Sequence, residues 1–158
     1  MISKDFTYNK SKVLQALRYH FITKKEIRIM MILVNLFAIL SVSFYFWHKI
    51  QPLTFLVSSI LWFTVMIAFW FILPNIIFKN SATFQDHFKV LLANEHLVLE
   101  NERGSKSWPW TSFSSIIESP YFFHLYFDSR SFFLIPKDAF EGDELYKART
   151  IFNSKIGT

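Results

Sequence analysis

Two long stretches without a charged residue constrain this chain more than any other feature of its sequence. The first runs from Ile29 to Trp47 and the second from Ile50 to Phe78. A helix rises about 1.5 Å per residue, so each stretch is long enough to cross the roughly 30 Å hydrocarbon core of a bilayer. Pro52 suits the first turn of a helix, and Pro74 is expected to end or kink one. The sequence therefore predicts a transmembrane hairpin over residues 29–78, with spans at 29–47 and 53–73.

The distribution of charge explains the basic character of the chain without a nucleic-acid partner. The net charge is +5, and 52% of the residues are hydrophobic against 18% charged. Residues 1–28 hold seven basic and two acidic side chains, whereas residues 79–158 hold nine basic and ten acidic ones. The excess positive charge lies beside the hairpin, so no binding of nucleic acid is expected. The absence of cysteine excludes disulfides and thiolate metal sites.

Basic residues near the ends of the spans predict the orientation. Lys24, Lys25, Arg28 and Lys79 lie on one side, and only Lys49 lies in the connection on the other side. By the positive-inside rule both termini are cytoplasmic, in a multi-pass protein of the bacterial inner (plasma) membrane. Neither span contains an ionisable side chain, which argues against transport. The polar residues of the spans are expected to pack the two helices against each other or to hydrogen-bond back to their own backbone, with Asn35 contacting a second copy or a partner helix as the alternative.

Residues 1–28 form a cytoplasmic N-terminal segment with two patterns. Residues 6–8 alternate like a short strand, and apolar residues from Val13 to Phe21 recur at helical spacing. This predicts an amphipathic helix that begins at Asn9 or Ser11. It either lies on the inner leaflet or covers the C-terminal domain.

Residues 79–158 are predicted to form a β domain closed by one helix. Apolar alternation and turn residues indicate six antiparallel strands at 88–92, 96–100, 106–110, 113–119, 121–127 and 131–135. A helical pattern follows at 143–153. The first turn, at residues 93–95, is expected to place Leu92 opposite His96.

Two motifs in this region resemble those of a known family. A Trp-x-x-Phe-x-x-Ile-Ile-Glu-Ser run spans Trp110 to Ser119, and an Ile-Pro-Lys-x-x-Phe run spans Ile135 to Phe140. With two preceding apolar helices, they resemble the bacterial YcxB-like family. The resemblance implies a pleckstrin-homology-like domain, a curved antiparallel sheet with a C-terminal helix. The whole chain is then an α+β membrane protein, and no activity is implied.

Few residues are arranged for catalysis. None of the five histidines has the i, i+4 spacing of a helical metal pair. Glu118 and His124 can form a general acid–base pair if the fourth and fifth strands are neighbours, but no third group orients the histidine. We expect instead that Glu118 lies at a strand end and His124 on the less buried face. No catalytic residue, metal or cofactor is therefore expected.

Binding residues are sought among the exposed basic and aromatic side chains. Phe122, Tyr126 and Phe132 form an exposed patch with two tryptophans unless both sheet faces are covered. Arg130 is expected to pair with Asp128, and Lys137 with Asp138. Alternatively, the two cations contact lipid headgroups or a partner. The candidate binding residues are Lys24, Lys25, Arg28, Trp108, Trp110, Arg130 and Lys137.

These features predict a non-enzymatic interaction or regulatory module anchored in the inner membrane. Its partners are the lipid bilayer and a protein, either a different one or a second copy. An immunity protein that neutralises a membrane-acting toxin is the alternative, by analogy of size and topology, with the cognate toxin as partner. An enzyme that acts on lipid is a more remote alternative.

Overall fold

The computed structural model describes residues 1–156 and divides into two compact units. The first, here called the β unit, joins Met1–Ala16 to the chain from Ser81 onward. The second, here called the hairpin unit, is Leu17–Asn80. The N-terminal residues therefore fold with the β domain, although the hairpin unit separates them from it in the sequence.

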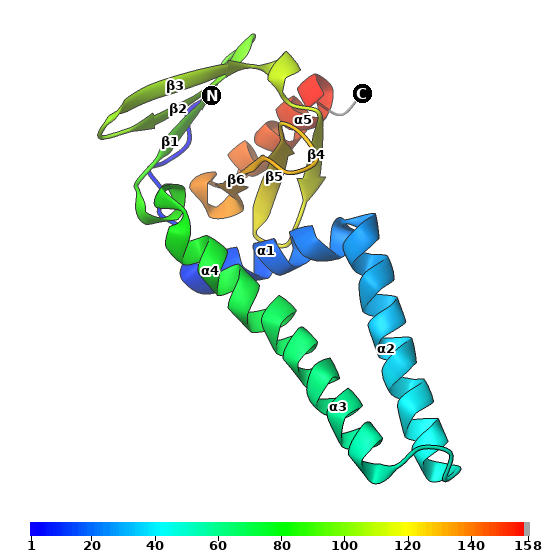
Figure 1. Ribbon diagram of the computed structural model, residues 1–158. Coiled ribbons are helices and arrows are strands. Elements are labelled where there is room, and N and C mark those ends of the chain that lie inside the picture. Colours follow the sequence, from blue (N-terminus) through cyan, green and yellow to red (C-terminus); the bar gives the residue numbers. More distant parts are fainter. Residues whose placement is uncertain (157–158) are drawn as a thin grey trace. The chain divides into compact units, whose positions relative to one another are not determined.

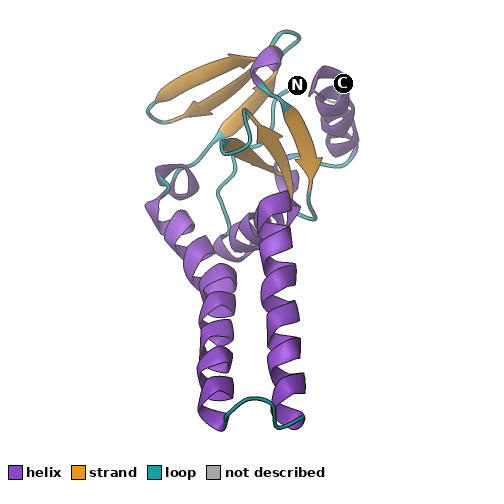
Figure 2. Ribbon diagram, turned by 45° about the vertical axis from the view of Figure 1, so that its right-hand side comes forward, coloured by secondary structure: helices purple, strands orange, loops and turns teal. Residues whose placement is uncertain are grey.

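The hairpin unit contains the two long helices that the uncharged stretches predict. The first is α2 (Lys25–Phe46), and the second runs without a break through α3 (Pro52–Ile67), a π-helical turn (Ala68–Ile72) and α4 (Leu73–Asn80). Figure 2 shows these helices as the two arms of a hairpin. Both are long and apolar enough to cross a bilayer. The connection between them turns tightly through His48, which adopts the left-handed backbone conformation at φ 52°.

The second helix does not end at Pro74, where an end or a kink was expected, but continues to Asn80. Proline has no N–H group, so the carbonyl of Trp70, four residues earlier, receives no helical hydrogen bond from it. The helix widens to a π turn directly before Pro74. Arg18 Nε donates to the Trp70 carbonyl at 2.8 Å. The side chain of Arg18 thus satisfies the acceptor that proline leaves open, and the helix continues to Asn80.

The β unit contains all six predicted strands and the C-terminal helix. The strands are β1 (Lys89–Leu92), β2 (His96–Asn101), β3 (Gly104–Pro109), β4 (Ser115–Glu118), β5 (Phe122–Tyr126) and β6 (Phe132–Pro136). The helix is α5 (Asp143–Ile156). The strands form two antiparallel sheets, β1-β2-β3 (the first sheet) and β4-β5-β6 (the second sheet), where a single curved sheet had been expected. Figure 1 shows both sheets and α5.

The register of the first hairpin differs from the prediction by one residue. Leu92 pairs with Leu97, and the Ala93 N–H donates to the His96 carbonyl at 3.0 Å. The loop is therefore two residues long, shorter than the predicted turn. This register places Leu97 and Leu99 on the buried face of β2.

The N-terminal segment adds to the edge of the first sheet. Phe6 and Phe88 exchange backbone hydrogen bonds of 2.9 and 3.0 Å, and the Ser3 N–H donates to the Val90 carbonyl at 2.8 Å. Helix α1 (Lys10–Thr23) follows, with the Asn9 side chain accepting from the Lys12 N–H at its start. Residues 1–16, which include the first half of α1, thus fold with the β domain.

The core of the β unit lies on both faces of β5, whose five residues are all buried. On one face the ring of Phe123 lies 5.0 Å from that of Phe152 in α5. On the other face Phe122 stacks on Tyr8 at 6.3 Å. One face is therefore covered by the C-terminal helix and the other by the N-terminal segment.

Candidate functional site

Glu118 joins the second sheet to α5 through two cations. Arg149 donates to both of its carboxylate oxygens, at 2.8 and 2.9 Å, and Lys137 Nζ lies 2.6 Å from one of them. The hydrogen bond from Arg149 and the nearby Lys137 lower the pKa of Glu118 to about 2. Lys137, a candidate binding residue, is therefore engaged within the β unit, and its side chain is only 18% exposed.

The possible acid–base pair of Glu118 and His124 does not form. Strands β4 and β5 are neighbours, but Glu118 pairs with Phe123 while His124 pairs with Ile117. Because directly paired residues share a face, Glu118 and His124 lie on opposite faces of the sheet. His124 is completely buried beside the rings of Tyr126 and Phe132, so its placement on a less buried face was wrong.

The predicted loop ion pairs take other partners. Asp128 Oδ1 accepts from the backbone N–H groups of Arg130 and Ser131, at 2.6 and 2.8 Å, and these bonds lower the pKa of its carboxyl group. Asp138 pairs with Lys12 of α1 at 2.6 Å. Arg130 itself is exposed at the loop, where it is open to a partner.

The aromatic side chains that were candidates for an exposed patch are mostly buried. Trp110 is 5% exposed, and its indole Nε1 donates to the Ala93 carbonyl at 3.1 Å. Phe122 and Tyr126 lie in the core as well. The structure therefore has the other alternative, in which both faces of the sheet are covered. Trp108 alone among the candidate tryptophans keeps part of its surface open.

Trp108 lines a cavity of about 420 Å³ in the β unit, here called the Trp108 pocket. Its apolar lining comes from both sheets and consists of Phe88, Leu99, Trp108 and Phe133. Its polar lining includes Thr83, Asp86, Asn101, Arg103, Ser105 and Lys106. A cavity that combines apolar and aromatic side chains with polar groups is a common form of small-molecule site.

The two cations of the Trp108 pocket, Arg103 and Lys106, differ in their partners. Arg103 Nη2 pairs with Asp86 at 3.1 Å. Lys106 Nζ lies over the Trp108 ring, 5.1 Å from its centroid. Among residues 1–156 no carboxylate lies within ion-pair distance of Lys106. The pocket therefore carries one positive charge that its own residues leave uncompensated.

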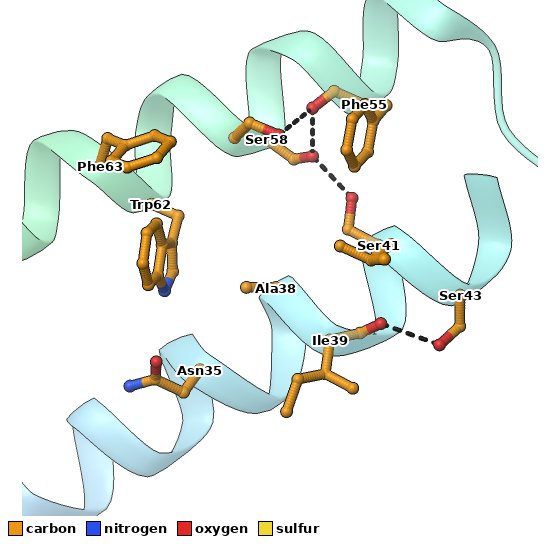
Figure 3. A pocket seen from close by; sticks show the side chains of 11 residues that line it. Asn35, Ala38, Ile39, Ser41, Ser43, Phe55, Ser58, Trp62 and Phe63 are labelled. Carbon is orange, nitrogen blue, oxygen red and sulfur yellow. Dashed lines mark hydrogen bonds between the residues drawn. The ribbon is translucent and has the colours of Figure 1, made fainter. Parts of the chain in front are cut away.

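A second cavity, also of about 420 Å³, lies along α2 and α3 in the hairpin unit. Figure 3 shows its polar groups, with Ser41 Oγ and Ser58 Oγ joined at 2.7 Å across the two helices. Asn35 bonds back to the Met31 carbonyl of its own helix at 2.7 Å. Ser41 and Ser58 therefore join the two helices, and Asn35 bonds back to its own backbone, which are the two arrangements that the sequence predicts.

The three basic candidates before the first span lie around the start of α2. Lys24 precedes the helix, and Lys25 and Arg28 lie exposed in its first turns. Burial, with a smaller contribution from Lys24, lowers the pKa of the preceding His20 to about 4. Across residues 1–156, no group of three or more His, Asp or Glu side chains is arranged to hold a metal ion.

Sequence reasoning missed two residues of interest, Lys106 and Arg18. Lys106 alternates with Trp108 along β3, a spacing that places both on one face, so the signal was present. Arg18 lies within the predicted amphipathic helix. Nothing local in the sequence connects it to a carbonyl fifty-two positions away.

Comparison with known proteins identifies one region. Residues 92–148 match the family model described as YcxB-like protein, which confirms the resemblance of the two motifs. No curated protein and no solved structure matches the chain.

Proposed function

We propose that this chain, whose residues 92–148 belong to the YcxB-like family, is a non-enzymatic interaction module anchored in the bacterial inner membrane. The observation that carries the proposal is the presence, in one chain, of two long apolar helices and a separate compact β unit. The hairpin unit anchors the chain in the bilayer. The β unit lies in the cytoplasm and binds a protein or lipid partner.

Membrane insertion is supported by the surface of the hairpin unit. Large apolar side chains lie exposed along both helices, including Leu33, Phe37, Ile60 and Phe63. An apolar surface of this extent is costly in water and favourable in lipid. Lys24, Lys25 and Arg28 at the start of α2 and Lys79 at the end of α4 favour a cytoplasmic position for both termini.

A pleckstrin-homology-like fold for the β unit is supported by two antiparallel sheets closed by a C-terminal helix. Partner binding is supported by the Trp108 pocket, which combines an open aromatic surface with an uncompensated lysine. Arg130, exposed at a loop of the same unit, is a second basic residue available to a partner.

The membrane topology is tested by single cysteines, because the chain contains none of its own. Lys49→Cys lies in the hairpin connection and Ser154→Cys in α5. An impermeant maleimide added to spheroplasts should label Cys at position 49, and should label position 154 only after the membrane is opened. Extraction of the protein by carbonate, or the reverse labelling pattern, contradicts the proposal.

Partner binding is tested by a photo-crosslinking residue placed at one position at a time in native membranes. The position of Lys106, in the Trp108 pocket, is compared with that of Lys147, which is exposed on α5. A crosslinked species specific to position 106 is expected. Equal products at both positions, or none at either, speak against a partner at this pocket.

A further inference from the structure

We infer that the Trp108 pocket binds an anionic single-chain amphiphile from the membrane, with the acyl chain on the aromatic lining and the anionic head at Lys106. This inference rests on the proposed membrane anchoring and names the class of ligand for the β unit. The pocket lies wholly within the β unit, so each contact below is internal to that unit.

The apolar lining is an uncovered continuation of the core. Register pairs Leu97 with Trp108 and Leu99 with Lys106, so these four residues share the inner face of the first sheet. Leu97 and Leu99 are buried, whereas Trp108 is partly open and Lys106 exposed. The inner face therefore extends past the packed core at β3 and leaves a cavity of about 420 Å³. Cavities of roughly 300–1,000 Å³ accommodate small organic ligands.

The charge of the pocket selects an anion. Of its two cations, Arg103 is paired with Asp86, while Lys106 has only the π face of Trp108. A carboxylate, sulfonate or phosphate head at the pocket mouth would give Lys106 a charge-assisted hydrogen bond. A neutral ligand of the same length gains no such bond.

Lys106 has a second possible role, since an inward-pointing lysine on an edge strand discourages pairing with another chain. That role requires no ligand. It predicts that the Trp108 pocket binds neither the acyl chain nor the anionic head group of an amphiphile. The two roles are therefore separable by a binding measurement.

The chain itself connects the pocket to the proposed anchor. Ala82 and Thr83 line the pocket and follow almost directly after Asn80, the last residue of α4. If α4 ends at the bilayer surface, the pocket wall is only a few residues of chain away from lipid. The ligands supplied at that surface are amphiphiles, which fit an apolar cavity with a cationic rim.

The test uses the full chain in lipid nanodiscs with 5-fluorotryptophan at its five tryptophans. The ¹⁹F resonance of Trp108 is identified by its loss in Trp108→Phe. The probe is 1-decanesulfonate, which stays anionic at every working pH, and the matched neutral probe is 1-decanol. Empty nanodiscs correct for the fraction of probe that partitions into lipid.

We expect decanesulfonate to shift the Trp108 resonance in a saturable way while the buried Trp110 resonance stays in place. Lys106→Glu should raise the half-saturating concentration roughly tenfold or more, and Lys106→Gln by a smaller factor. The control Lys147→Glu, at an exposed position on α5, should leave it unchanged. Decanol should bind more weakly than decanesulfonate.

Two results overturn the inference. One is an unshifted Trp108 resonance in a protein whose Trp110 resonance shows that the β unit is folded. The other is equal binding of decanol and decanesulfonate, unaffected by either Lys106 variant. The same preparation is also tested for resistance to carbonate extraction. If it resists, the proposed membrane anchoring stands and only the proposed ligand binding is contradicted.

Discussion

Tyr8 ties the N-terminal segment to the second sheet through one buried hydroxyl group. Its Oη donates to the Leu134 carbonyl at 2.7 Å. Its ring makes edge contacts with Phe6 at 5.6 Å and Phe84 at 5.1 Å. Burial raises the pKa of this hydroxyl far above its usual value, so the group remains a donor at any working pH.

Tyr8→Phe should lower the stability of the β unit by about 1–2 kcal/mol, because the ring is kept while a buried hydrogen bond is lost. Thermal unfolding followed by near-ultraviolet circular dichroism measures the change. Tyr146→Phe is the matched control, since Tyr146 is 69% exposed. Equal midpoints for Tyr8→Phe and the control would show that the hydroxyl contributes nothing.

Glu118 gives the β unit a stability that depends on pH. Its pKa of about 2 in the folded protein lies below the usual 4.5 of a glutamate side chain, so folding favours the charged form. The resulting stabilisation is fully present above pH 4.5 and is lost as the pH falls toward 2. Because the side chain is 35% exposed, solvent screening limits it to about 1 kcal/mol.

Glu118→Gln should therefore destabilise the protein near pH 7 and have a smaller effect as the pH approaches 2. Urea unfolding at several pH values measures this difference. Glu102→Gln, at an exposed turn, is the control and should show no such trend. A destabilisation by Glu118→Gln that is the same at all pH values contradicts the role of its charge.

At the scale of elements, the π turn of the second helix depends on a residue outside that helix. Pro74 leaves the Trp70 carbonyl without a helical donor, and Arg18 supplies one. The Arg18 guanidinium also lies over the Phe71 ring, 5.5 Å from its centroid. The turn and the arginine therefore act as a pair.

A double-mutant cycle of Arg18→Ala and Pro74→Ala tests this pair. Arg18→Ala alone should lower thermal stability in detergent by about 1–3 kcal/mol, because it leaves a carbonyl unsatisfied. In the Pro74→Ala background the restored N–H can bond to that carbonyl, so the same arginine change should cost less. Strictly additive effects would separate the arginine from the proline.

The elements themselves were predictable from local pattern, but their pairing was not. Alternation of apolar residues located all six strands, since period-two burial is a local property. The division into two sheets depends on contacts far apart in sequence, such as Tyr8 with Leu134. β5 is buried on both faces, so its alternation could not tell where His124 lies. The candidate site was only partly predictable: Trp108 was among the predicted residues, whereas the burial of Trp110 depends on its contact with Phe152 of α5.

At the scale of the whole molecule, the β unit is discontinuous in sequence. Residues 1–16 and those from 81 onward fold together, while Leu17–Asn80 forms the hairpin unit. Phe6 and Tyr8 are both buried in the β unit. We therefore expect the C-terminal part to be incomplete when it is expressed by itself.

Residues 81–158 alone should fail to unfold cooperatively in urea, because β1 and β5 lose apolar cover and backbone partners. Joining residues 1–16 to position 81 through a flexible glycine–serine linker should restore a cooperative transition, followed by tryptophan fluorescence. The same fusion with residues 1–16 in scrambled order is the control. Cooperative unfolding of 81–158 without the segment would show that the segment is dispensable.

The pairing of the N-terminal segment with β1 also fixes an order of events during synthesis. The segment leaves the ribosome first but finds its partner strand only after the whole hairpin has been made, a separation of about eighty residues between Phe6 and Phe88. Closing so long a loop is slow unless its ends are already held near each other. If the hairpin is inserted in a bilayer as it is translated, it would hold them so, and membrane insertion would be the step that permits the β unit to fold.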